Sequence, residues 1–287
     1  MGVVDYWCNA FSEDRRALWQ HAIAAQGIPL KVRTDEDDSF AAAEIMVSRM
    51  DALSIDTLIL PCAEVPEAAD ALAYERYATH PAELEKYAAA HPGRFAGLVS
   101  FDPSRGLAGV RDAARTLERG PYVGLHLHTH SFDRAFDHRD LYPFYSLAAD
   151  RSLPVVVQAG ASGGRMPSEC GRPIGIDRPA LYFGDTSFVL SHTGWPWTDE
   201  AIAMAQKHPN VHLGTAAYPP HHWSAELVQF LTGPGRGKTL FGTSFPVVGH
   251  RQALGRLADL DLDSDTRAEL LEGTARRIFK TLKSANH

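Results

Sequence analysis

The chain has 287 residues, of which 45% are hydrophobic and 22% are charged, a composition typical of a globular protein rather than a disordered or fibrous one. Its net charge of −7, with no block of like charges, argues against a nucleic-acid-binding surface, which is usually a concentrated basic face. The three cysteines, Cys8, Cys62 and Cys170, are far apart and form no CxxC pair, so neither a disulfide framework nor a thiolate zinc site is indicated.

Short apolar segments alternate with segments of helical period along the whole chain. We predict strands at residues 3–9, 56–62, 94–101, 122–130, 153–160, 187–194, 210–218 and 238–246. We predict helices at residues 40–53, 81–91, 109–119, 141–150, 178–183, 199–208, 224–233 and 250–260. Strands that alternate with helices pair in parallel, and eight such units match a (β/α)₈ TIM barrel better than an open doubly wound sheet.

Three further segments complete this architecture. Residues 263–282 have the pattern of an amphipathic helix that closes the barrel. Two long loops, Ser12–Ser39 and Gly160–Arg178, follow the first and fifth strands at their carboxyl ends, where a barrel places its chemistry. Because no repeat or linker divides the chain, we expect a single barrel domain over residues 1–287.

Several motifs resemble one known family when they are taken in order. They are HPGRFAGLVSFDP (91–103), GRPIGID (171–177), FVLSHTGWPW (188–197), LFGTSFP (240–246) and LEGTARRIF (271–279). The set is similar to the amidohydrolase-related family, in the branch that contains aminocarboxymuconate-semialdehyde decarboxylase and related hydrolases. The resemblance implies a barrel that holds a divalent metal, usually zinc. It implies as ligands a His-x-His after strand 1, a histidine after strand 5 and an aspartate after strand 8, with a strand 6 histidine as acid or base.

This sequence departs from that pattern at every position of the metal ligands. Trp7 and Asn9 replace the two histidines of strand 1, Gln158 replaces that of strand 5, and Ser244 replaces the aspartate of strand 8. Only His192 on strand 6 matches. An indole N–H, two amides and a hydroxyl are poor ligands for a transition metal, so we predict no metal and no other cofactor.

A relocated metal site is one alternative. His126, His128 and His130 are spaced two residues apart, which would place them on one face of a strand. If that face points inward, His126 and His128 would lie near His192, and three imidazoles are an adequate zinc site. The other interpretation is that these are hydrogen-bonded structural histidines.

Three residues are our candidates for catalysis. His192 ends an apolar strand, and an imidazole there could exchange a proton near neutral pH. His128 would lie close to it. Asp5 shares strand parity with Trp7 and Asn9, so we expect it to face inward, one layer deeper. Structural hydrogen bonding is the competing interpretation for each.

The expected binding surface combines aromatic, neutral polar and basic groups. Two tryptophans would form a wall for a planar substrate, and the neutral groups at the former metal position would bind a carbonyl or carboxylate. Two arginines of the long loop could clamp a carboxylate, although charged loop residues are mostly exposed to solvent. The expected substrate-binding residues are Trp7, Asn9, His126, Gln158, Arg165, Arg172, Trp195 and Ser244.

The sequence therefore leads to three hypotheses. The first is a metal-independent lyase or hydrolase that uses His192 as acid or base on a small cyclic or unsaturated carboxylic or carbonyl compound. Decarboxylation, hydration, cyclisation and lactone hydrolysis all fit it. The second is a non-catalytic binding protein, and the third is a hydrolase with its metal at His126, His128 and His192. No leader or membrane segment is indicated, so we expect a cytoplasmic protein; the resemblance implies a homodimer.

Overall fold

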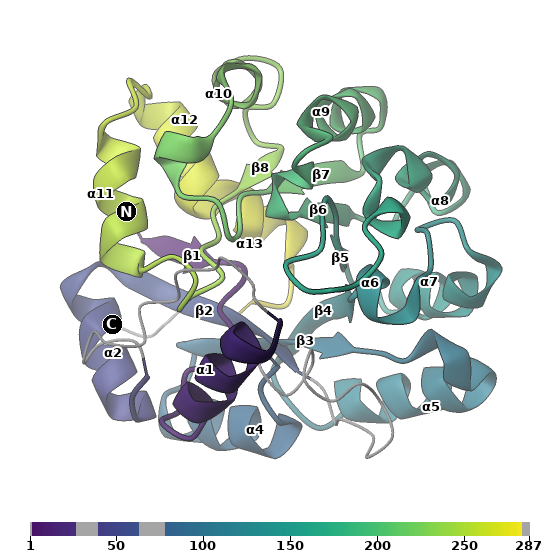
Figure 1. The fold of residues 1–287 in the computed structure, drawn as a ribbon, viewed down its shortest axis with the longest axis horizontal. Coiled ribbons are helices and arrows are strands. Elements are labelled where there is room, and N and C mark those ends of the chain that lie inside the picture. Colours follow the sequence, from purple (N-terminus) through teal and green to yellow (C-terminus); the bar gives the residue numbers. More distant parts are fainter. Residues whose placement is uncertain (1, 27–39, 63–77, 283–287) are drawn as a thin grey trace.

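The computed structural model describes residues 2–26, 40–62 and 78–282, in which eight parallel strands form one sheet in chain order (Figure 1). The strands are β1 Val3–Asp5, β2 Ile55–Cys62, β3 Phe95–Ser100, β4 Tyr122–Leu127, β5 Val155–Gln158, β6 Phe188–Ser191, β7 Val211–Gly214 and β8 Thr239–Leu240. Backbone contacts beyond β1 and β8 bring the two ends of the sheet together. The Tyr6 N–H donates to the Phe241 carbonyl at 3.1 Å, and Cys8 forms a parallel bridge with Phe245. The predicted (β/α)₈ barrel is confirmed.

Helices surround these strands on the outside (Figure 1). They are α1 Arg15–Gln26, α2 Ala43–Ala52, α4 Pro81–Ala90, α5 Gly106–Leu117, α6 Thr129–Phe132, α7 Tyr142–Asp150, α8 Asp177–Tyr182, α9 Thr198–Lys207, α10 Ala225–Thr232, α11 His250–Ala258, α12 Ser264–Ala268 and α13 Thr274–Ile278. A π-helical turn, Glu269–Gly273, joins α12 to α13. None of the helices in these ranges is long and apolar enough to cross a membrane.

The strands are apolar on both faces because each face is buried against a different partner. Val156 of β5 belongs to the cluster inside the barrel, whereas Val155 and Val157 belong to the cluster beneath the helices. Side chains alternate between the two faces of a strand, so a strand buried on both faces is a continuous apolar run. Burial of each such valine stabilises the fold by about 1.5–3 kcal/mol.

The closing helix lies at the amino ends of the strands. Ala275, Ile278 and Phe279 contribute to the inner cluster. Arg276 Nη2 lies 3.0 Å from Asp56 Oδ2 near the start of β2, and the Gly2 N–H donates to Glu272. A hollow lined by Ala96, Val123 and Leu282 remains at the amino ends of β3 and β4, whereas barrels of this kind bind their ligands at the carboxyl ends.

Several predicted boundaries were wrong; the eighth strand, for example, ends at Leu240 rather than at Pro246. The first strand ends at Asp5 rather than at Asn9, because the Asp5 carboxylate accepts the Trp7 N–H at 3.0 Å and turns the chain. The fourth strand ends at Leu127, because His128 accepts the N–H of Ser131 and caps α6. The predicted loop Ser12–Ser39 contains α1, while its residues 27–39 lie outside the described part of the chain.

Candidate active site

Trp7 occupies the barrel interior near the carboxyl ends of the strands. Its side chain is 2% exposed and belongs to the inner cluster. Its ring contacts His126 edge-on at 4.6 Å and His192 edge-on at 5.2 Å between centroids. Its Nε1–H donates to Asn9 Oδ1 at 2.8 Å. The indole therefore stands among the candidate histidines and is fixed there by the neighbouring amide.

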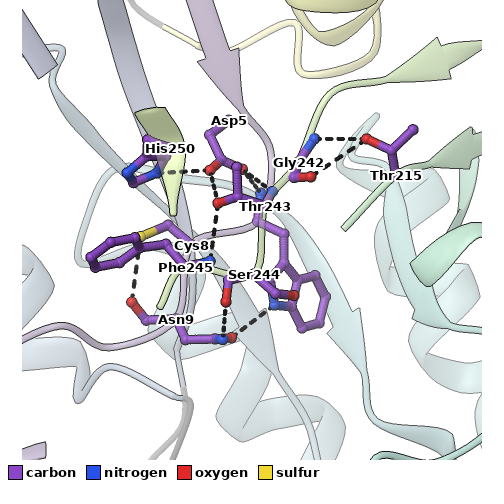
Figure 2. Close-up of polar contacts among 10 residues, drawn as sticks. Asp5, Cys8, Asn9, Thr215, Gly242, Thr243, Ser244, Phe245 and His250 are labelled. Carbon is purple, nitrogen blue, oxygen red and sulfur yellow. Dashed lines mark hydrogen bonds and ion pairs between the residues drawn. The ribbon is translucent and has the colours of Figure 1, made fainter. Parts of the chain in front are cut away.

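Asn9 and Ser244 are joined across the line where the first and last strands meet. The Asn9 side-chain amide donates to the Ser244 carbonyl at 2.9 Å, and the Ser244 N–H donates to the Trp7 carbonyl at 2.8 Å (Figure 2). Ser244 has a φ of 53°, a left-handed conformation that is strained for a residue with a side chain. Three of the predicted site residues thus form one connected cluster.

The Asp5 carboxylate bonds to Thr243 and to His250 of the outer helix α11, which corrects the prediction that it faces inward. Its carboxylate is fully buried and accepts hydrogen bonds from Thr243 Oγ1 at 2.5 Å and from the Thr243 N–H at 3.1 Å (Figure 2). His250 Nε2, at the start of the outer helix α11, lies 3.0 Å away. The parity argument failed because Tyr6 and Trp7 both point inward once the strand has ended.

His192 follows β6 and is half-buried. Its Nδ1 lies 2.8 Å from Ser191 Oγ, and its Nε2 lies 3.4 Å from Ser244 Oγ. Desolvation, with the neighbouring imidazole of His130 as a smaller cause, lowers the pKa of His192 to about 3. The ring is therefore neutral at physiological pH, and any acid–base role has to start from neutral imidazole.

The three histidines within and just after β4 point to different partners. His126 Nδ1 lies 2.8 Å from Ser100 Oγ on the neighbouring strand, and burial lowers the pKa of His126 to about 3. His128 Nδ1 accepts hydrogen bonds from Ser131. His130, whose pKa is also lowered by burial, lies on α6 with Nε2 2.9 Å from the Gly160 carbonyl.

Gln158 ends β5 directly beside Ser191 of β6. It shares strand parity with Val156 of the inner cluster, so its side chain points into the barrel. The side chain is 9% exposed, and within the described ranges no hydrogen bond to its amide is formed. This amide can therefore bind a ligand without breaking an existing contact.

The long loop after β5 does not present both arginines as a clamp. Arg172 makes ion pairs with Glu200 and Glu169 and lies over the Trp197 ring at 5.6 Å, so its guanidinium is already engaged. Arg165 is exposed. Trp195 is 53% exposed and lies 6.0 Å from the Tyr218 ring, so it is available as an outer aromatic surface.

Sequence reasoning missed Tyr6 and Ser191. Tyr6 is fully buried, and its hydroxyl lies 2.7 Å from Ser191 Oγ. A Cβ on Gly214 would come within 2.1 Å of Tyr6 Oη, and one on Gly242 within 2.4 Å of its ring. Glycines inside two predicted strands mark a close approach and were the available signal.

The four residues at the positions where the resemblance implies metal ligands do not fit a metal ion. Trp7 offers no lone pair, and the amide of Asn9 is bonded to Trp7 and Ser244. Within the described ranges no three His, Cys, Asp or Glu side chains are arranged to hold a metal, so the relocated site does not form. At the position of the relocated site, the Trp7 ring contacts both His126 and His192.

The fold and this site define a (β/α)₈ barrel with a polar cluster at the carboxyl ends of its strands. A sequence model described as Amidohydrolase matches residues 4–281, and the chain belongs to the amidohydrolase family. No curated protein matches the chain.

Three solved structures show the same fold at low identity. An uncharacterised TIM-barrel protein, Bb4693 from Bordetella bronchiseptica, is 20% identical with a TM-score of 0.78, covering 98% of this chain and 99% of its own. 5-Carboxyvanillate decarboxylase LigW from Sphingomonas paucimobilis is 17% identical with a TM-score of 0.69 over 97% and 99%. A dihydroxybenzoic acid decarboxylase from Polaromonas sp. JS666, solved with manganese and 2-nitroresorcinol, is 16% identical with a TM-score of 0.70 over 99% and 98%.

Proposed function

We propose that this protein is an enzyme that acts on a small aromatic or unsaturated carboxylic or carbonyl compound without a metal ion, and that decarboxylation is its reaction. The position of His192 carries the proposal. It follows β6 at the carboxyl end, is partly exposed, and has an oxygen near each ring nitrogen. Decarboxylases among the similar structures support the choice of reaction.

The groups around His192 suit this chemistry because they are neutral. Trp7, Gln158 and Ser244 carry no charge, so a bound carboxylate would lose its hydration without gaining an ion pair. The negative charge would spread as the bond between the carboxyl group and the carbon breaks. Carbon dioxide would leave neutral, and the electron pair left on carbon would take up a proton from a water molecule, with neutral His192 as acid or base for that transfer and hydroxide as the second product.

The other polar residues of the site have supporting roles. The Gln158 amide and the hydroxyl of Ser244 would bind the polar end of the substrate, and His128 is a second candidate for proton transfer. Asp5 would hold the turn that carries Ser244, through its bonds to Thr243. Hydration, cyclisation and lactone hydrolysis could use the same groups.

A non-catalytic binding role is the second candidate. The observation in its favour is that Trp7, only 2% exposed, fills the interior where relatives would hold a metal. A small planar compound could bind over this indole at the mouth without reacting.

The test is turnover of 5-carboxyvanillate and dihydroxybenzoic acids by protein treated with EDTA, followed by release of carbon dioxide. We expect activity to survive the chelator and to fall by a factor of about 10²–10⁴ in His192→Ala, the usual contribution of a general acid or base. His222→Ala, an exposed histidine, is the matched control. Turnover that requires added metal, or that survives His192→Ala, would contradict the proposal; saturable binding without turnover would favour the binding role.

We also propose a single domain over residues 1–287 and a cytoplasmic homodimer. Ile174, Leu181 and Tyr182 lie close together in sequence and are 48%, 66% and 75% exposed, which supplies apolar surface for pairing. Light scattering after size-exclusion chromatography would measure the mass, and a monomer would contradict the pairing.

A further inference from the structure

A chain of hydroxyl groups leads from the barrel interior to His192. Tyr6 Oη lies 2.7 Å from Ser191 Oγ, and Ser191 Oγ lies 2.8 Å from His192 Nδ1. Tyr6 and Ser191 are both fully buried, so water does not compete for these bonds. The direction of the hydrogen bonds along this chain decides which ring nitrogen of His192 carries the proton.

The Tyr6 hydroxyl sets that direction. Its oxygen is hydrogen-bonded to that of Ser191. A phenol, with an ordinary pKa near 10, is a stronger acid than an alcohol, so it is the better hydrogen-bond donor of the two and its oxygen is the poorer acceptor. The hydrogen of Tyr6 therefore points to Ser191.

The hydrogen bond from Tyr6 in turn makes Ser191 a donor to the imidazole of His192. Its oxygen accepts the hydrogen of Tyr6, and its own hydrogen then points to Nδ1 of His192 at 2.8 Å. An Nδ1 that accepts a hydrogen bond carries no proton, so the proton of the neutral ring is on Nε2.

We propose that Tyr6 and Ser191 are positioning residues that fix His192 as the neutral tautomer protonated on Nε2, so that it faces the site as a hydrogen-bond donor. The uncharged groups around the His192 ring are consistent with its neutral state. Trp7 packs against it, Ser244 is neutral, and the pKa of its neighbour His130 is lowered by burial. The nearby carboxylate of Asp5 is already bonded to Thr243 and His250.

The backbone around His192 fixes the direction of its Nε2–H, whose hydrogen bond to Ser244 is long. His192 and Thr193 both have left-handed backbone conformations, with φ of 63° and 55°, before Gly194 at 73°. Strain of this kind persists where the surrounding structure imposes it, and it often marks a functional site. The only hydrogen bond of Nε2 within the described ranges is the 3.4 Å contact with Ser244 Oγ, which a substrate oxygen could replace.

The inference deepens the proposed function by naming the form in which His192 would act. A neutral imidazole N–H can polarise a carbonyl or stabilise negative charge that develops on a substrate oxygen, a pattern known in isomerases. The chemical role rests on the proposed function, whereas the tautomer does not.

The first test needs no substrate. Nitrogen-15 NMR of the full-length protein, with the His192 signals assigned by their loss in His192→Gln, reports which nitrogen carries the proton. We expect protonated Nε2 and unprotonated Nδ1 throughout pH 5–8. A protonated Nδ1, or an imidazolium at pH 6, would overturn the proposal.

Variants then test the relay. In Ser191→Ala and Tyr6→Phe, we expect the ratio of the Nε2–H to the Nδ1–H tautomer to fall by about fivefold, the factor for one net hydrogen bond. Ser191→Thr keeps the hydroxyl and should restore the ratio, and Ser187→Ala, just before the start of β6, should leave it unchanged. An unaltered ratio in Ser191→Ala would show that the relay does not set the tautomer. If a variant does not fold, the wild-type spectrum still decides which nitrogen is protonated.

A second arm separates this inference from the proposed function. If dihydroxybenzoic acids are decarboxylated, Ser191→Ala should lower kcat by more than it raises KM, because the donor acts on charge that develops in the transition state. An equal effect on both would overturn the catalytic role of the tautomer. If the wild type turns over nothing, the proposed reaction fails while the NMR result stands.

Discussion

Replacement of Asp5 by alanine should destabilise the protein far more than a typical surface substitution. The carboxylate is fully buried and accepts four hydrogen bonds or close contacts, from Trp7 N, Thr243 N, Thr243 Oγ1 and His250 Nε2. His250 is itself 5% exposed and stacks on Phe245 with ring centroids 4.7 Å apart. The alanine variant would leave these donors without a partner in a region that water does not reach.

The magnitude follows from that loss. Removing one partner from a buried polar pair costs about 3–5 kcal/mol, and each unsatisfied buried donor costs about 1–3 kcal/mol. We therefore expect the free energy of unfolding to fall by about 4 kcal/mol in Asp5→Ala. Asp5→Asn keeps one acceptor oxygen, and Thr243 can rotate its hydroxyl to accept from the new amide, so we expect a fall of about 1–2 kcal/mol.

Urea denaturation followed by circular dichroism would measure these changes. Asp259→Ala is the matched control, because this exposed carboxylate forms a surface ion pair with exposed Arg256 and its loss should change stability by less than about 1 kcal/mol. Adding His250→Phe, which keeps the stacking on Phe245, tests coupling: the double variant should cost less than the sum of the two single variants. If Asp5→Ala unfolds at the same urea concentration as the wild type, the assigned role of this carboxylate is wrong.

Three further predictions concern the site. Gln158→Leu should raise KM, or the Kd of a bound acid, about 3–10-fold, because the ligand would lose a hydrogen bond to the amide. The melting temperature should stay unchanged, because this amide makes no hydrogen bond within the described ranges. An unchanged KM would show that Gln158 does not bind the ligand. Burial lowers the pKa of His126 to about 3, below the value near 6.5 in the unfolded chain. Between these two pH values the unfolded state binds more protons than the folded state. The free energy of unfolding therefore falls as the pH drops from 6.5 towards 3, by up to about 1.4 kcal/mol per pH unit. His126→Gln should flatten that slope in urea titrations, and an unchanged slope would refute the assignment. Metal analysis of the purified protein should find no stoichiometric transition metal. The quadruple variant Trp7→His, Asn9→His, Gln158→His and Ser244→Asp should gain metal affinity, because imidazole and carboxylate are good metal ligands. Tight metal binding by the wild type would contradict the argument that its side chains at these positions are poor ligands.

Much of the architecture was accessible from local patterns. Alternation of short apolar segments with helical segments requires parallel strands joined by crossovers, and eight such units close into a barrel. The continuous apolar run of β5 was informative because each face of the strand has its own buried cluster. The boundaries were less accessible: β1 and β4 end where Asp5 and His128 bond to nearby backbone N–H groups, and such bonds are not visible in hydrophobic periodicity.

The candidate site was also only partly predictable from the sequence. The indole, amide, amide and hydroxyl side chains at the four positions where the resemblance implies metal ligands were visible in the sequence, as was the histidine that follows β6. Which groups surround that histidine was not visible. Parity placed Asp5 inside and did not select Tyr6, yet the chain leaves the sheet after Asp5, so Tyr6 and Trp7 both enter the interior.

By itself, then, the sequence determined the barrel and its family, and it showed weakly coordinating side chains at the four positions where the resemblance implies metal ligands. These features depend on residue type and spacing along the chain. Tertiary structure decided that Trp7 packs against His126 and His192, that Asp5 binds the turn before Ser244, and that Tyr6 and Ser191 reach His192. These contacts join residues up to 238 positions apart, and their geometry depends on how strands from distant parts of the chain meet when the barrel closes.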